Sequence, residues 1–234
     1  MRKIAMVAVL ALVAGSAQAG SLGLPNLVGN PGFETGSLPP WNNTGWGGVN
    51  DYGYFGVPAP SWGGGQKWFG IVSSWGGSWD GPVNLLRQVV DVSQSPGWNP
   101  SYPQLEVDLQ FDRLLKAVSG DTWRDVGIRV WLDWMEDGSY PYPGDPGYTR
   151  QMVYEESMPA GNDYPSSNDW VHKEIRLTLP SQPQFLSIEV EMIVHYAMWS
   201  FVGVDNVDLE ARCIPEPATM GLLLLGLPLV RRRR

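Results

Sequence analysis

Apolar and polar residues alternate with a period of two in several separate segments of this chain. The pattern is clearest in residues 186–196, where Leu186, Ile188 and Val190 fall on one face of an extended backbone. Side chains on a strand point alternately to opposite faces, so such a segment places one face in a core and the other in solvent. The strands predicted in this way cover residues 84–92, 105–111, 126–134, 171–179, 186–196 and 202–209.

Clusters of proline and glycine, such as Ser95-Pro96-Gly97, separate these segments and indicate turns. Many strands with one polar face are typical of an antiparallel β-sandwich. Two stretches do not alternate, residues 39–81 and 137–147, and both are expected to be loops, with residues 66–72 as a further strand candidate inside the first. No linker is long enough to mark a second domain, so we expect one all-β domain over residues 20–212.

The first 19 residues have the three parts of a secretory signal peptide. Arg2 and Lys3 supply the positive charge, residues 4–13 the apolar stretch, and Ala17-Gln18-Ala19 a small-residue cleavage site. The sequence therefore predicts an N-terminal signal helix, export, and a mature chain that begins at Gly20.

The other end carries an apolar segment between two proline residues and a cluster of positive charge. Pro215, Glu216 and Pro217 precede the apolar residues 218–230, and four arginines follow. These are Arg231, Arg232, Arg233 and Arg234. A helix over the apolar segment would be about 20 Å long, whereas a bilayer core is about 30 Å thick. We expect a short apolar helix that associates only transiently with the inner membrane.

This tripartite tail, residues 213–234, resembles the PEP-CTERM sorting signal of bacterial surface proteins. The resemblance implies recognition by an exosortase, a membrane protease that cuts near Pro-Glu-Pro. It also implies a final location at the cell-envelope surface or in the extracellular matrix.

The net charge argues against anionic partners. The whole chain carries −8, but six of its 16 Lys and Arg residues lie in the two ends, against one of its 24 Asp and Glu residues, which leaves −13 for the part between them. Such a surface should repel nucleic acid and is compatible with divalent cations and neutral glycans. The single cysteine, Cys213, excludes an intrachain disulfide.

Two segments near the ends of the mature domain form a recognisable pair. Residues 26–34 read Asn-Leu-Val-Gly-Asn-Pro-Gly-Phe-Glu, with Trp41 shortly after, and residues 201–209 read Phe-Val-Gly-Val-Asp-Asn-Val-Asp-Leu. With the middle strand at residues 85–92, they resemble the galactose-binding-like jelly rolls, including carbohydrate-binding modules of the family 4/9/22 type. The resemblance implies a jelly-roll sandwich and a polysaccharide ligand.

First and last strands can lie side by side in a jelly roll, so Glu34 can approach Asp205. Their oxygens, with backbone carbonyls, would suit Ca²⁺, and the resemblance implies a structural calcium at this place. The alternative is that both are surface charges or turn caps.

Six of the twelve tryptophans lie between Trp41 and Trp79, among glycines and serines. Flat rings of this kind stack on sugar rings, and each exposed ring could contribute about 1–3 kcal/mol by analogy with base stacking. The predicted ligand-binding residues are Trp46, Trp62, Trp75, Trp79, Tyr52, Tyr54 and Asp80. Trp41 and Trp68 are expected in the core, and the alternative is that all these rings pack the long loop onto the sandwich.

Signals for catalysis are weak. His172 and His195 are the only histidines, His195 shares its strand face with Glu189 and Glu191, and no known catalytic spacing is present. We therefore expect a non-catalytic, polysaccharide-binding surface protein. The alternatives left open are a structural or adhesive matrix protein that binds proteins or itself, and a glycan-cleaving enzyme.

Overall fold

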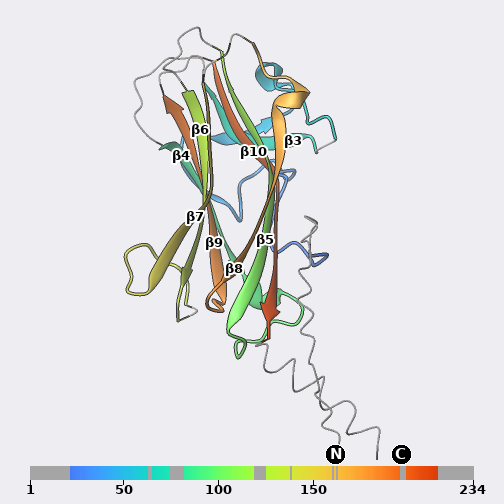
Figure 1. Ribbon diagram of the computed structural model, residues 1–234. Coiled ribbons are helices and arrows are strands. Elements are labelled where there is room, and N and C mark those ends of the chain that lie inside the picture. The colour runs from blue at the N-terminus through green and yellow to red at the C-terminus, as the bar shows by residue number, and fades with distance from the viewer. Residues whose placement is uncertain are drawn as a thin grey trace, which may run out of the picture.

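The computed structural model describes residues 22–62, 65–73, 82–118, 125–137, 139–159, 161, 163–195 and 199–215. Two five-stranded antiparallel sheets pack face to face, which confirms the predicted β-sandwich (Figure 1). The expected signal helix and C-terminal helix lie outside the described residues, as do Glu216 and Pro217 of the sorting motif. Within the described residues, no helix is both long enough and apolar enough to cross a membrane.

The chain passes between the two sheets several times. The first sheet has the order β1 (Asn42–Gly45), β4 (Pro82–Asp91), β9 (Phe185–His195), β6 (Asp125–Met135) and β7 (Tyr148–Pro159). The second sheet has the order β2 (Gly48–Asp51), β3 (Lys67–Ser73), β10 (Ser200–Ile214), β5 (Gln104–Ala117) and β8 (Trp170–Leu179). Short 3₁₀ helices are present at Tyr54–Gly56, Val92–Gln94 and Ser167–Asp169.

The main core lies between the sheets and consists of the apolar positions that alternate along the strands. Leu109 of β5, Ile128 of β6 and Ile188 of β9 are all fully buried there, together with Trp41. The expectation that Trp41 and Trp68 are core residues is confirmed, but Trp68 belongs to a different cluster.

That smaller cluster lies on the outer face of the second sheet. Val57, Trp68, Leu114, Trp170 and Phe201 are buried together, and the Trp170 indole N–H donates to the carbonyl of Pro58 (2.9 Å). The segment after β2 therefore crosses the outside of this sheet and covers its apolar residues.

All six strands predicted from the alternation are present, and residues 66–72 correspond to β3. The expectation that residues 39–81 form loop apart from a possible strand at 66–72 is wrong for two short segments, because β1 pairs with β4 at the edge of the first sheet and β2 pairs with β3 at the edge of the second. β7 was not predicted. None of its residues is fully buried, since it is an edge strand, so the apolar alternation that reveals the inner strands is weak there.

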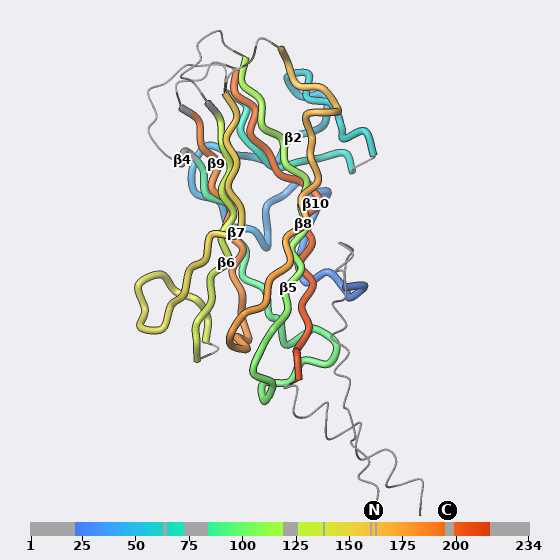
Figure 2. The backbone as a smooth tube through the Cα atoms, viewed as in Figure 1, coloured from blue at the N-terminus to red at the C-terminus, as the bar shows by residue number. Residues whose placement is uncertain are grey.

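The segment of residues 26–31 lies along the last strand, as expected (Figure 2). Leu27 N–H donates to the carbonyl of Leu209 (2.9 Å), and Val207 N–H donates to the carbonyl of Pro31 (3.0 Å). Asn26 adds a side-chain hydrogen bond to the Val207 carbonyl (3.0 Å). These bonds bring Glu34 to the side of the sandwich where β10 carries Asp205.

Candidate functional site

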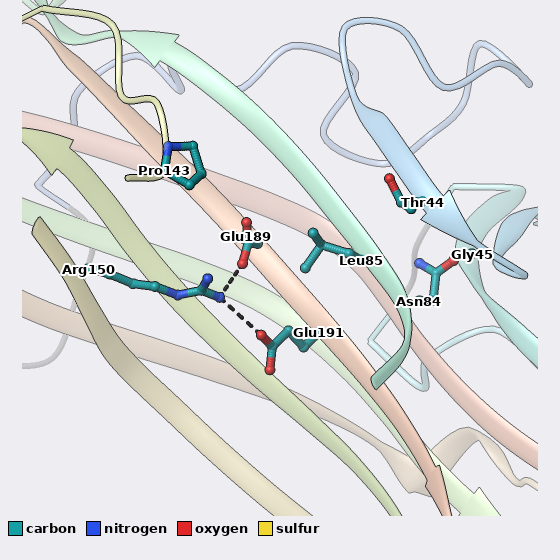
Figure 3. Close-up of a pocket in the computed structure, with 8 residues that line it drawn as sticks. All are labelled: Thr44, Gly45, Asn84, Leu85, Pro143, Arg150, Glu189 and Glu191. Atoms are coloured by element: carbon teal, nitrogen blue, oxygen red, sulfur yellow. Dashed lines mark hydrogen bonds and ion pairs between the residues drawn. The ribbon is translucent and has the colours of Figure 1, made fainter. Parts of the chain in front are cut away.

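A groove of about 460 Å³ opens on the outer face of the first sheet. Its lining residues come from β1, β4, β9, β7 and the β6–β7 loop, so it runs across the strands (Figure 3). These residues are Thr44, Gly45, Asn84, Leu85, Pro143, Arg150, Glu189 and Glu191. A volume of this size is in the range of small-ligand sites.

The outer face of the first sheet around the groove carries rows of cross-strand neighbours. Residues paired across antiparallel strands share one face of the sheet, and the outward positions of β4, β9, β6 and β7 fall into three such rows. The rows are Leu85–Glu191–Arg129–Glu155, Arg87–Glu189–Trp131–Met152 and Val89–Ser187–Asp133–Arg150. Positive and negative side chains therefore alternate across this face, with an indole among them.

Arg150 ties this surface together. Its Nη2 donates to Glu191 Oε1 (3.0 Å) and to Glu189 (Figure 3). Its guanidinium carbon lies 4.3 Å from the centre of the Trp131 ring. Stacking of a guanidinium on an indole is favourable and fixes the orientation of its N–H groups. The three contacts hold the Arg150 side chain against the sheet at the β7 side of the groove.

Two carboxyl groups here are hidden from water. Burial raises the pKa of Asp133 to about 6, the charge of Glu189 adds to this, and Tyr148, Arg150 and Arg87 oppose it. Burial likewise raises the pKa of Glu189, against the effect of Arg150. No hydrogen bond of good geometry reaches either oxygen of Asp133 from the described residues, and its nearest cation is Arg150 Nε at 3.8 Å.

The β6–β7 loop closes one end of the groove. Arg87 donates from Nε to Ser187 Oγ (2.7 Å) and from Nη2 to the carbonyl of Pro141 (2.6 Å), which holds the loop against the sheet. Tyr142, the next residue, is 58% exposed, and its ring lies 5.0 Å from that of Tyr140. An accessible aromatic pair therefore adjoins the charged floor.

The predicted ligand-binding residues are not gathered in this groove. Trp46 and Trp62 are more than half exposed, but only Trp46, which directly follows the groove residue Gly45, belongs to the same side of the molecule. Tyr54 is exposed and packs edge-on against Phe55 (4.6 Å between ring centres). Trp75, Trp79 and Asp80 lie outside the described residues.

Trp62 and Tyr52 belong to a polar cluster on the outer face of the second sheet. Trp62 Nε1 donates to Asp112 Oδ2 (3.1 Å), and His172 Nδ1 lies 2.8 Å from Asp112 Oδ1. The Tyr52 hydroxyl donates to Asp205 Oδ2 (2.5 Å), and burial, with the charge of Asp205, raises the pKa of Tyr52. In this cluster an indole and a phenol satisfy buried carboxylates.

Glu34 and Asp205 come near one another, but their oxygens face hydrogen-bond donors. Glu34 accepts the N–H groups of Gln66 (2.9 Å) and Lys67 (3.0 Å), while Asp205 accepts Tyr52 O–H and Asn206 N–H (2.8 Å). Calcium needs six to eight free oxygen ligands, and no group of three or more acidic, histidine or cysteine side chains suited to a metal occurs in the described part of the chain. The side chains as they stand do not fit Ca²⁺, and calcium here stays a prediction.

Burial also raises the pKa of Asp205, to about 7. The charges of Asp112 and Glu34 act in the same direction, whereas the hydrogen bonds from Tyr52 and Asn206 oppose it. The second sheet thus carries a carboxylate that is costly to ionise.

Sequence reasoning missed Arg150, Trp131 and Asp133. It placed Glu189 and Glu191 on one strand face but gave them no role. The alternation itself could have identified Trp131 and Asp133. Once the inward residues of β6 and β9 are assigned to the core, the residues between them must share the opposite, outward face. Arg150 was out of reach, because β7 was not recognised as a strand.

Comparison with protein-family models finds no match, and comparison with curated proteins finds none either. Among solved structures, the chain is similar to the carbohydrate-binding module TmCBM61 in complex with β-1,4-galactotriose, with 16% identity, a TM-score of 0.46, and coverage of 80% of this chain and 99% of that one. It is also similar to the C-terminal family 22 carbohydrate-binding module of Clostridium thermocellum Xyn10B (12% identity, TM-score 0.44, 77% and 89% covered). A third similar structure is the Stig cyclase Fisc from Fischerella sp. TAU (18% identity, TM-score 0.49, 80% and 97% covered). At these identities and TM-scores, the function has to be argued from this chain's own residues.

Proposed function

We propose that this protein is an exported, non-catalytic polysaccharide-binding β-sandwich and that the groove on the first sheet is its binding site. The observation that carries the proposal is the groove itself, about 460 Å³ in volume, with the Glu189–Arg150–Glu191 bridge on its floor. Sugar hydroxyl groups both donate and accept hydrogen bonds, so a floor of alternating carboxylates and guanidinium groups offers partners for both.

Aromatic side chains supply the second element of sugar recognition. Tyr142 and Tyr140 present accessible rings at one end, and Trp46 directly follows the groove residue Gly45 at the other. Rings of this kind cover the apolar face of a sugar while the polar floor takes its hydroxyl groups. Because aromatic residues occur at both ends of an open groove, a polymer chain that enters and leaves fits better than a small enclosed molecule.

Binding is favoured over cleavage by the burial of the acidic groups. Asp133, whose pKa of about 6 would suit a general acid, is 0% exposed, and Glu189 is buried and held by Arg150. A glycosidase needs two carboxyl groups that reach the scissile bond from opposite sides. A buried acid under a guanidinium group serves better to position Arg150.

The proposed location follows from the two ends of the sequence. The signal peptide at residues 1–19 would direct export, and the PEP-CTERM-like tail would hold the chain briefly in the inner membrane until an exosortase removes it. A polysaccharide-binding domain released in this way would meet its ligand at the cell surface or in the extracellular matrix.

The proposal is tested by affinity electrophoresis of the purified chain through gels that contain different polysaccharides. Tyr142→Ala should weaken the affinity for the polysaccharide about tenfold or more, because it removes one stacking ring, and the protein should be retarded less. Tyr164→Ala, equally exposed at 54%, belongs to an aromatic group around Trp199 and should change nothing. The absence of retardation in every polysaccharide by a folded sample, or an equal effect of both variants, would reject the groove as the binding site.

A further inference from the structure

The sheet face around the groove holds one more negative charge than positive charge, and the groove lining itself holds two glutamates, Glu189 and Glu191, against one arginine, Arg150. The three cross-strand rows contain four carboxylates, Asp133, Glu155, Glu189 and Glu191, and three guanidinium groups. These are Arg87, Arg129 and Arg150. The excess is built into the register of β4, β9, β6 and β7, because each charged side chain occupies an outward position of its strand.

Each guanidinium group is already engaged. Arg87 bonds Ser187 and the Pro141 carbonyl, and Arg129 donates to Glu155 (2.7 Å) while lying 3.8 Å from Glu191. Arg150 is shared between Glu189 and Glu191. The protein therefore offers no further cation to an acidic ligand within this part of the described surface.

The most weakly compensated carboxylate is Asp133, whose partners are the Tyr148 hydroxyl and the distant guanidinium groups of Arg150 and Arg87. It has no exposed surface, neither oxygen accepts a hydrogen bond of good geometry from the described residues, and the neighbouring Tyr148 hydroxyl is itself buried without one. Arg150 Nε, 3.8 Å away, is more distant than a hydrogen bond allows. A buried carboxylate left in this condition is costly, and a cation in the groove above would relieve the cost.

We propose that the groove selects a polysaccharide with free amino groups, such as a polymer of de-acetylated hexosamine. A sugar ammonium group would lie between Glu189 and Glu191 on the side open to solvent and supply the missing positive charge. An acetylated amine carries no charge, and a uronic acid would add to the excess. This inference rests on the proposed function and names the class of its ligand.

The test compares three hexamers by isothermal titration calorimetry: β-1,4-glucosamine, β-1,4-N-acetylglucosamine and β-1,4-glucose. Measurements at about pH 6.5 lie above the pKa of Asp133, about 6, and below about 7.7–8.0, the range of a chain-terminal amine. The glucosamine hexamer should bind about tenfold more tightly than the other two. The advantage should shrink as salt is added, because charge–charge attraction is screened.

Asp133→Asn should abolish the preference, measured as the ratio of the affinities for the glucosamine and glucose hexamers. Glu191→Gln, at a less buried position, should also abolish this preference and serves if the first variant does not fold. Asp163→Asn, an exposed change of equal charge on the β7–β8 loop, should keep the preference.

The outcomes separate the two proposals. Binding of all three hexamers with equal affinity, or of an oligogalacturonate as tightly as glucosamine, overturns the charge inference and leaves polysaccharide binding intact. No binding of any hexamer or polymer overturns the proposed function. Tight binding of oligolysine without binding of any hexamer or polysaccharide would identify a protein ligand and overturn both.

Discussion

Gly203 of β10 faces Gly70 of β3 across the second sheet, and the indole of Trp68 occupies the space that their missing side chains leave. A Cβ on Gly203 would lie 2.6 Å from two ring carbons of Trp68. A Cβ on Gly70 would lie 2.3 Å from the same ring and from the Val202 carbonyl oxygen. The pair of glycines is what allows a tryptophan to lie flat and fully buried against the sheet.

We therefore expect Gly203→Ala to lower the free energy of unfolding by about 1–3 kcal/mol, the usual cost of overpacking. Gly48→Ala is the matched control, because Gly48 lies in β2 with nothing within 4 Å of an added Cβ. That change should stay within about 0.5 kcal/mol of the parent. Urea denaturation followed by tryptophan fluorescence would measure both, and equal stability of the two variants would contradict the packing described.

Adjacent residues of β7 provide a second contrast. Glu156 is on the inward face of β7, and both of its carboxylate oxygens accept hydrogen bonds from the buried Arg113. Arg113 Nη1 also donates to the Asp169 carbonyl (3.1 Å). Burial alone would raise the pKa of Glu156, but hydrogen bonds from Arg113 and Tyr154 lower it. Glu155, on the outer face, pairs with a partly exposed Arg129.

Glu156→Gln should cost about 3 kcal/mol, because it leaves the Arg113 charge buried without a counter-ion. Glu155→Gln should cost less than about 1 kcal/mol, as exposed ion pairs do. Thermal unfolding of both variants measures the difference. A small loss of stability in Glu156→Gln would mean that the Asp169 carbonyl and solvent are enough to stabilise the buried charge of Arg113.

The inner strands were predictable because a strand with one buried face has an apolar residue at every second position. β5, β6 and β9 each carry apolar residues at every second position over most of their length, so their faces and spans follow from Leu109, Ile128, Ile188 and their neighbours. β1 and β2 gave no such signal. They are four residues each and are rich in glycine and asparagine.

The candidate site was harder to predict for a related reason. A groove depends on which strands are neighbours, and the order β4-β9-β6-β7 joins residues far apart in sequence, such as Arg150 and Glu189. Alternation tells which face a residue occupies but not which strand lies beside it. The tryptophans of the long loop were conspicuous in sequence, yet the indole of Trp62 is tied to Asp112 on the other sheet.

Acidification should stabilise this protein over a defined range. The pKa is raised to about 7 at Asp205 and to about 6 at Asp133 and Asp208, chiefly by burial. A carboxyl group whose folded pKa exceeds its unfolded value penalises the folded state when ionised, so the penalty is complete above the folded pKa and disappears toward the unfolded one. Carboxyls with lowered pKa, such as Asp169, lose their contribution only below about pH 4.

The melting temperature should therefore rise between about pH 8 and pH 5 and fall below about pH 4, with each pKa unit equivalent to about 1.4 kcal/mol. Asp205→Asn should raise stability at about pH 8 and flatten the rise, because its amide oxygen can still accept from Tyr52. Asp145→Asn, on the exposed β6–β7 loop, should leave the profile unchanged. Calorimetric scans across this range would test the sign, and a melting temperature highest near pH 8 would refute it.

Trp131 is expected to act on the ligand through Arg150 and not by direct contact. The ring lies 4.3 Å beneath the guanidinium carbon and, unlike Arg150, does not line the groove.

Trp131→Leu removes the stacking surface, frees Arg150 from its bridge between Glu189 and Glu191, and should weaken polysaccharide binding about tenfold. Trp131→Phe keeps a ring under the guanidinium and should retain most of the affinity. Because the indole N–H makes no hydrogen bond within the described part of the chain, neither change should lower the melting temperature through a lost polar contact. Titration calorimetry with a polysaccharide retained by the parent protein measures the effect, and equal affinities of the leucine and phenylalanine variants would show that the stacking does not position Arg150.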